Sequence, residues 1–244
     1  GSYFVAEPDR FFGPFKNPKP VPMEHALGIK PEYKDQFASS ELCGSCHTVH
    51  LPVVHKGEVL KYVYEQTTYP EWLFSDYRTG KSPMGKPPLG AGKTPKSCEA
   101  CHMESADKHG KKFVSKIASI QEHSNFPEVE HGLPGKDIDI EEREGFARHT
   151  LAGLNVFLIK MAQQFPDVFG IPTQDPMLVK KGLPSLIRTE QKMIDQADDE
   201  VATIAVKDVK VEYGTLKAEV AIENLVGHKF PSGVGFRRAF VEFN

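Results

Sequence analysis

Two short stretches of the same form constrain this chain more than any other feature. Each is a Cys-x-x-Cys-His pentapeptide: residues 43–47 read CGSCH, and residues 98–102 read CEACH. Two thiols three positions apart can add across the two vinyl groups of one porphyrin, and the histidine that follows can give its imidazole to the iron. We therefore predict two haem c groups. The attachment residues would be Cys43, Cys46, Cys98 and Cys101, and the iron ligands would be His47 and His102.

Other uses of paired cysteines fit the two pentapeptides less well. Four cysteines can bind one Zn²⁺, but 51 residues lie between Cys46 and Cys98, against about 15–20 in an ordinary zinc ribbon. A thioredoxin-like redox pair needs a strand before it and a helix after it, and neither flank has that pattern. Disulfides and zinc both leave the two histidines unexplained. Only haem attachment uses all six residues.

Composition agrees with a chain that wraps around cofactors. Only 39% of the 244 residues are apolar, tryptophan occurs once, and there are 19 prolines and 20 glycines. This is little material for an ordinary core, whereas two porphyrins would supply large apolar surfaces. The net charge of −3 argues against a nucleic-acid partner. We expect a loop-rich protein.

The sequence also bears on where the protein works. No apolar run is long enough to span a membrane, and the first residues do not form a secretory signal. Covalent haem attachment takes place on the export side of the inner membrane. We therefore expect a mature or trimmed chain that is periplasmic or extracellular.

Six-coordinate irons would need further ligands. His25 lies 18 residues before Cys43, close to an attachment site, although a lone histidine is more often a surface residue. His149 begins the most apolar stretch of the chain, residues 149–161, for which we predict a buried helix. Met161 is the rival ligand there, but methionine in a helical stripe usually packs. We expect His50 to be a surface residue, the alternative being that it ligates the other haem. The histidines expected in loops are His55, His109, His123 and His131.

Periodicity predicts the remaining elements. Residues 68–77 suit a short helix with an aromatic face, and residues 176–201 suit an amphipathic helix. Alternating patterns predict strands at 209–213 and 216–222, and a third beginning near 239. We expect a mixed fold: a loop-rich, mainly α haem-packed domain at residues 1–201, followed by a small Ig-like β-domain at residues 202–244. Three strands do not close a sandwich, so further sequence or a partner strand would complete it.

Several segments together resemble a known family. The stretches ELCGSCHTVHLP, EQTTYPEWLFSDY, SCEACHM and GHKFPSG, in this order, are similar to multihaem c-type cytochromes of respiratory bacteria. In one group of these, two haem sites precede helices and a small β-sandwich. The resemblance implies electron transfer between closely spaced haems with histidine on both faces of iron. It implies His149 and His228 as distal ligands. Many relatives carry more than two attachment sites.

These observations favour an electron carrier whose partners are other redox proteins or cytochromes. Arg237 and Arg238, which follow the loop of His228, are candidates to pair with a haem propionate. The candidate distal ligands are His25, His149 and His228, one more than two haems need, so the spare histidine suits a third haem on another chain. Two alternatives stay open: a haem enzyme with one open iron that acts on a small nitrogen or oxygen species, and a redox-sensing or docking module.

Overall fold

The computed structural model describes residues 9–81, 95–107, 109–116, 142–171 and 185–242. The chain divides into two compact units, one made of Gly1–Cys101 with Ala197–Asn244 and the other of His102–Gln196. The boundary between them falls inside the helix that carries the second pentapeptide. The predicted boundary at residue 201 stays a prediction.

The first unit begins with a small parallel pair of strands. β1 (Arg10–Gly13) lies beside β2 (Lys30–Tyr33), and α1 (Pro20–Leu27) connects them. Proline is tolerated at the start of α1 because the first helical N–H groups have no partner within the helix. Gly28 ends α1 in the left-handed conformation, with φ of 67°. His25 is exposed in the last turn of this helix.

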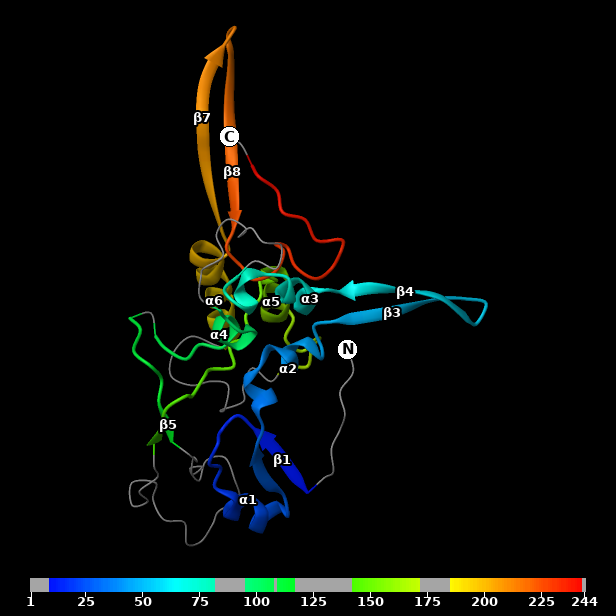
Figure 1. Ribbon diagram of the computed structural model, residues 1–244, viewed down its shortest axis with the longest axis vertical. Coiled ribbons are helices and arrows are strands. Elements are labelled where there is room, and N and C mark those ends of the chain that lie inside the picture. The colour runs from blue at the N-terminus through cyan, green and yellow to red at the C-terminus, as the bar shows by residue number, and fades with distance from the viewer. Residues whose placement is uncertain (1–8, 82–94, 108, 117–141, 172–184, 243–244) are drawn as a thin grey trace. The chain divides into compact units, whose positions relative to one another are not determined.

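The first pentapeptide lies between a short helix and a long hairpin. After η1 (Asp35–Ala38) comes α2 (Ser40–Gly44), and then β3 (Val49–His55) pairs antiparallel with β4 (Glu58–Gln66). The hairpin turns at Lys56 and Gly57, whose positive φ angles of 49° and 84° are those a two-residue turn requires. Figure 1 shows β4 leading straight back into α3 (Thr68–Leu73), which η2 (Asp76–Arg78) follows. The hairpin therefore returns the chain to the pentapeptide.

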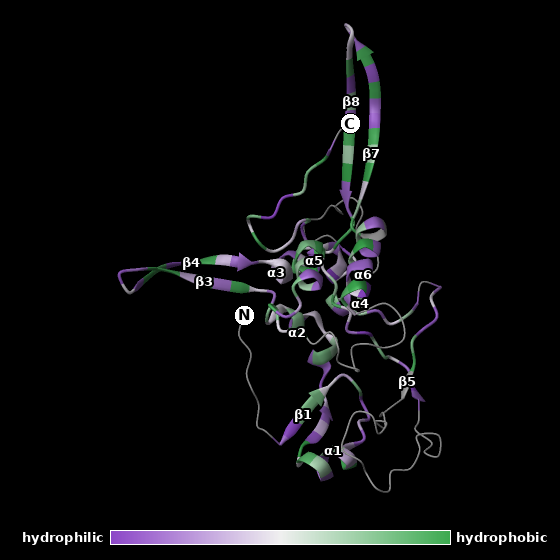
Figure 2. Ribbon diagram, turned by 180° about the vertical axis from the view of Figure 1, so that it is seen from behind, coloured by the Kyte–Doolittle hydropathy of each residue, from purple (hydrophilic) through white to green (hydrophobic). Residues whose placement is uncertain are grey.

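A second hairpin ends the first unit. β7 (Ala202–Glu212) pairs antiparallel with β8 (Thr215–Asn224) through a turn at Tyr213 and Gly214. Figure 2 shows hydrophobic and hydrophilic residues alternating along both strands. The register places Ile204 opposite Ile222, so the apolar residues share one face. The predicted hairpin is confirmed.

The described residues of the second unit include two helices and a short strand pair. The unit takes the end of α4 (Cys98–His102), a two-residue pair of β5 (Ser115–Lys116) with β6 (Glu142–Arg143), α5 (Val156–Gln164) and most of α6 (Ser185–Glu200). The described part of the predicted 176–201 helix is α6. Residues 172–184 lie outside the described residues.

The expected fold class, a mainly α haem-packed domain with an Ig-like β-domain, is wrong. The structure is about 30% helical and 28% strand, with few helices and short sheets. Every sheet of the described residues has two strands, and the expected third strand near residue 239 is irregular chain. Two strands form one layer, and a sandwich needs two.

The helix expected from residue 149 begins only at α5. Leu151 has a positive φ of 44°, a conformation outside any right-handed helix. The side chain of Asn155 accepts a hydrogen bond from Leu158 N at 3.3 Å and caps α5 at its N-terminus. His149 therefore lies on irregular chain, and apolar spacing alone overestimated the helix.

The described residues bury little apolar surface. The buried hydrophobic residues are Ala152, Ala162, Met193 and Val201. Large apolar side chains on both hairpins are exposed, including Tyr62 at 66% and Ile204 at 62%. A chain of this size ordinarily buries far more, because hydrophobic burial is the main force that opposes conformational entropy. Something other than these residues is needed to cover the exposed apolar surface.

Candidate functional site

The helices of the two pentapeptides lie against each other within the first unit. Cys98 N donates a hydrogen bond to Ser40 Oγ at 3.0 Å, and Cys43 Sγ donates to Glu99 Oε1 at 3.7 Å. Ser40 is 2% exposed, so this contact is closed to water. The two hydrogen bonds join residues 58 and 56 positions apart, and the first cysteine of each motif faces the other helix.

Burial distinguishes the two cysteines of each motif. Cys43 and Cys98 are half-buried, while Cys46 and Cys101 are exposed. Burial, the Glu99 carboxylate and the neighbouring Cys98 raise the pKa of the Cys43 thiol to about 12. Burial also raises the pKa of Cys98. Both of these thiols are therefore neutral at pH 7.

Glycine is required at one position of the first motif. A Cβ atom on Gly44 would lie 2.6 Å from Tyr69 Cγ, so the tyrosine ring rests directly on the motif backbone. Tyr69 N also donates to His47 O at 3.1 Å. Through these two contacts α3 packs on α2. The expected aromatic helix therefore supports the motif, although it ends at Leu73 and not at Tyr77.

The imidazole of each motif histidine is oriented by a carbonyl oxygen. His47 Nδ1 lies 3.0 Å from Gln66 Oε1, and His102 Nδ1 lies 3.1 Å from Ala152 O. An amide oxygen only accepts, so Nδ1 must carry the proton in both rings. This tautomer places the lone pair on Nε2. It is the arrangement that metal-ligating histidines have in proteins.

A segment from the end of the chain is anchored on α3. Glu71 Oε2 accepts hydrogen bonds from Lys229 N and Ser232 Oγ, both at 3.0 Å, and Glu71 Oε1 accepts from Thr67 Oγ1 at 2.7 Å. Tyr77 Oη donates to Leu225 O at 2.7 Å. We call residues 225–233 the returning loop. It carries His228, whose Nδ1 donates to Lys229 O at 3.0 Å.

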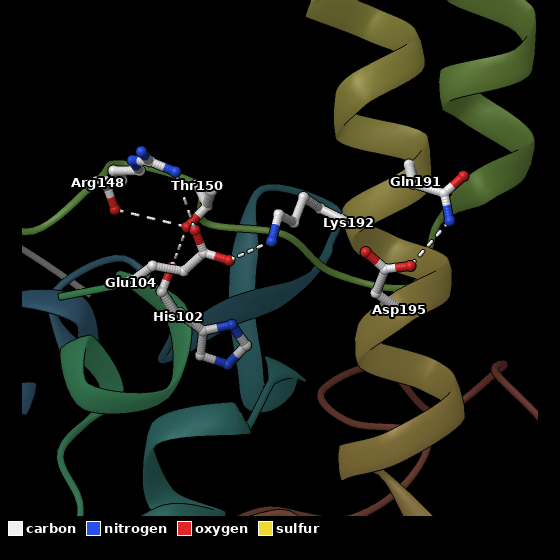
Figure 3. A network of polar contacts seen from close by, with 7 residues as sticks. All are labelled: His102, Glu104, Arg148, Thr150, Gln191, Lys192 and Asp195. Carbon is white, nitrogen blue, oxygen red and sulfur yellow. Dashed lines mark hydrogen bonds and ion pairs between the residues drawn. The ribbon is translucent and has the colours of Figure 1, made fainter. Parts of the chain in front are cut away.

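In the second unit, residues 148–152 run beside the end of α4. Leu151 N donates to His102 O at 2.9 Å, and Arg148 N donates to Glu104 O at 2.8 Å. We call residues 148–152 the strap. Figure 3 shows the polar network that holds it: the Glu104 carboxylate contacts Lys192 Nζ at 2.6 Å and Arg148 Nη1 at 3.8 Å. His149 is exposed on the strap.

The remaining predicted site residues are less constrained. His25 is exposed on α1 and takes part in none of the contacts above. Arg238 Nη1 donates to Gly235 O and to Arg237 O, so its guanidinium is already engaged with nearby backbone. His50 makes an edge contact with Tyr64, the ring centroids being 3.9 Å apart. Residues 117–141, with His123 and His131, lie outside the described residues.

Sequence reasoning missed the residues that orient the histidines. Gln66 lies in a polar stretch whose sequence has no helix or strand periodicity. Ala152 acts through its backbone carbonyl, and a side-chain pattern cannot reveal such a contact. Glu71 was placed on a helix but not assigned a contact. The capping-box spacing of Thr68 and Glu71, three positions apart, was the available signal.

Searches against known proteins returned no match: no family model, curated protein or solved structure matches the chain. Among the described residues, which include all four cysteines, no group of three or more histidine, cysteine, aspartate or glutamate side chains is placed to hold a metal ion. Within the same residues, no helix is both long enough and apolar enough to cross a membrane.

Proposed function

We propose that this protein transfers electrons by means of two covalently attached haem c groups, one at each pentapeptide. The observation that carries the proposal is the matched orientation of His47 and His102. In each ring Nδ1 faces a carbonyl oxygen, and metal-ligating histidines in proteins make this contact through the ring nitrogen that does not bind the metal.

Each group would be held by one motif. Cys43 and Cys46 would form the thioether bonds of the first site, and Cys98 and Cys101 those of the second. The neutral, half-buried thiols of Cys43 and Cys98 fit this use, because attached sulfur carries no charge. Haem supplies one-electron chemistry, since its iron alternates between Fe(III) and Fe(II). The chain's own residues bind and orient these centres.

Two further observations support the proposal. The described residues leave many large apolar side chains exposed and bury only four hydrophobic residues, and flat apolar porphyrins are suited to cover such surface. The two motif helices also share hydrogen bonds. Attachment sites on touching helices suit centres that exchange electrons with each other.

Distal ligands are part of the proposal. His228 on the returning loop and His149 on the strap are the favoured candidates, and His25 is the third. Ligation of both faces by histidine would keep the potentials fairly low, because it is methionine with histidine that raises them. The partners would be other redox proteins or cytochromes, in the periplasm or outside the cell, with a spare histidine available to a haem of another chain.

Spectroscopy of the exported protein tests the function. The full chain is produced in cells that attach haem c, and its absorption is recorded oxidised and reduced, with electron paramagnetic resonance on the same sample. Two low-spin haems per chain are expected. The matched variants Cys43→Ala with Cys46→Ala, and Cys98→Ala with Cys101→Ala, should each lose one. A high-spin signal from half the iron would contradict a pure carrier and favour the enzyme alternative.

A further inference from the structure

We infer that Gln66 is a positioning residue that sets the potential of the iron bound by His47, and of that iron alone. The inference rests on the proposed haem sites but goes beyond them, because it assigns a tuning role to a residue that no motif contains. Gln66 Oε1 accepts the Nδ1 proton of His47 at 3.0 Å. It is therefore the group through which the chain acts on the electron density of that imidazole.

The hairpin places Gln66 where this contact requires it. Gln66 is the last residue of β4 and lies opposite Val49, two residues beyond His47. The strands β3 and β4 thus leave the first motif and return to it (Figure 1). A register shift between Val49 and His50 marks an irregularity at this end of the ladder. Such irregularities commonly re-aim a side chain.

Packing limits the freedom of the Gln66 side chain. A Cβ atom on Gly233 would lie 3.5 Å from Gln66 Cγ, so the returning loop lies against the glutamine stem. Thr67 Oγ1 donates to Gly233 O at 3.3 Å and ties the same segments together. Gln66 is itself half-buried. A side chain held along its length can present one oxygen to one nitrogen with little entropic cost.

The second motif provides a built-in comparison. His102 Nδ1 donates to Ala152 O, a backbone carbonyl that no substitution removes. The two imidazoles therefore have the same tautomer, but only the first has an acceptor that a mutation can change. A substitution at Gln66 should alter one iron and leave the other as an internal reference.

The direction of the effect follows from ligand basicity. A hydrogen bond from Nδ1–H pushes electron density to Nε2 and makes imidazole a better donor, which favours Fe(III) and lowers the potential. Loss of the acceptor should raise the potential. A carboxylate accepts more strongly than an amide, so it should lower the potential further.

The test is a redox titration of the full two-haem protein after its haem content has been measured. Gln66→Leu should shift the Fe(III)/Fe(II) equilibrium constant of one haem about tenfold towards Fe(II), which is about +59 mV for one electron. Gln66→Glu should shift the same haem the other way, and the second haem should not move. The control variant Gln191→Leu makes the same chemical change at an exposed position of α6 and should leave the potentials of both haems unchanged.

The design separates a positioning role from structural damage. Damage would shift both Gln66 variants in the same direction or disturb both haems, and either result would overturn the inference. If Gln66→Leu does not fold, Gln66→Asn shortens the side chain and is expected to shift as leucine does. Two attached haems with unchanged potentials in all Gln66 variants would refute the role of Gln66 and leave the proposed function standing. A chain without attached haem would refute both.

Discussion

In both motifs an acceptor oxygen orients the histidine and a glutamate anchors a distant segment of the chain, but the residues and their burial differ. The first histidine, His47, is exposed and takes its orientation from a side chain, Gln66, whereas His102 is half-buried and takes its orientation from the backbone at Ala152. In each case a glutamate anchors a distant segment: Glu71 holds the returning loop, and Glu104 holds the strap. A side-chain acceptor can be changed without altering the fold, so the first site is the one open to tuning.

The parallel extends to the candidate distal ligands. The returning loop carries His228 and the strap carries His149, so each anchored segment has one predicted ligand in the same unit as the motif histidine, His47 or His102. The contacts of the two glutamates differ in kind. Glu71 accepts three hydrogen bonds from half-buried or backbone donors, whereas Glu104 pairs with two partly exposed cations. The first anchor should therefore matter more for stability.

The largest loss of unfolding free energy is expected when Glu71 is replaced. Glu71→Ala leaves Lys229 N without its acceptor and leaves Ser232 Oγ with Thr68 Oγ1 as its remaining acceptor. Hydrogen bonds to charged groups contribute about 1.5–3 kcal/mol each, so a loss of about 3 kcal/mol of unfolding free energy is expected. Denaturant unfolding of the variant measures this change. Glu65→Ala, one strand position from Gln66, is the matched control and should cost less than about 0.5 kcal/mol. A cost below about 1 kcal/mol for Glu71→Ala would show that the returning loop is not anchored there.

A smaller loss of unfolding free energy is expected when Gly44 is replaced by a residue with a side chain. Gly44→Ala would place a methyl group against the Tyr69 ring, and overpacking of this kind costs about 1–3 kcal/mol. The loss should be partly recovered in the double variant with Tyr69→Ala. A double-mutant cycle measures the coupling. If the two changes simply add, the ring does not rest on Gly44.

Glu104 should contribute less than Glu71. Glu104→Gln removes the ion pairs with Lys192 and Arg148, whose side chains are 40% and 55% exposed, so the expected cost is about 0.5–1 kcal/mol. The cost should shrink as salt rises from about 0.05 to 0.5 M, because exposed charges are screened. Unfolding at both salt concentrations provides the measurement. A cost that equals that of Glu71→Ala would remove the difference between the two anchors.

The smallest expected effect is the pH dependence of stability that arises from the cysteine thiols of the chain before haem attachment. Because the pKa of Cys43 is raised to about 12 in the folded chain, its thiol stays neutral where an unfolded thiol has ionised. Its contribution to stability is therefore complete below about pH 9 and is lost as the pH rises towards about 12. Glu99→Gln should lower this pKa, since the carboxylate is one of its causes.

Alkylation at pH 8 followed by peptide mass spectrometry checks the thiol prediction. The exposed Cys46 and Cys101 should react well before Cys43 and Cys98. Equal rates for all four would contradict the burial seen at the first cysteines. Urea-unfolded chain is the control, because all four thiols should then react alike.

The β7–β8 hairpin was easier to predict than the rest of the fold. It follows from a local pattern, because a two-residue turn depends on neighbouring residues. Haem attachment at the two pentapeptides stays a prediction. The helix expected at residue 149 and the third strand near residue 239 were wrong. Apolar residues of these segments, such as Leu151 and Phe240, are exposed in the structure, and periodicity does not report what a segment packs against.

The contacts that orient the two motif histidines could not be predicted from the sequence, for a different reason. Gln66 and Ala152 act through single acceptor oxygens brought back by the hairpin and the strap, over 19 and 50 residues of chain. Hydrogen bonds of this range depend on tertiary placement. Only Gly44 carried a local hint, because glycine inside the motif permits the close approach of Tyr69.

The most direct test of the central claim is the intact mass of the full chain, purified under denaturing conditions from cells that attach haem c. Two covalently attached haem groups per chain are predicted, with one lost when the cysteines of either motif are replaced by alanine. An intact mass equal to the polypeptide alone would contradict the account, because every role proposed for His47, His102 and Gln66 depends on the two attached groups.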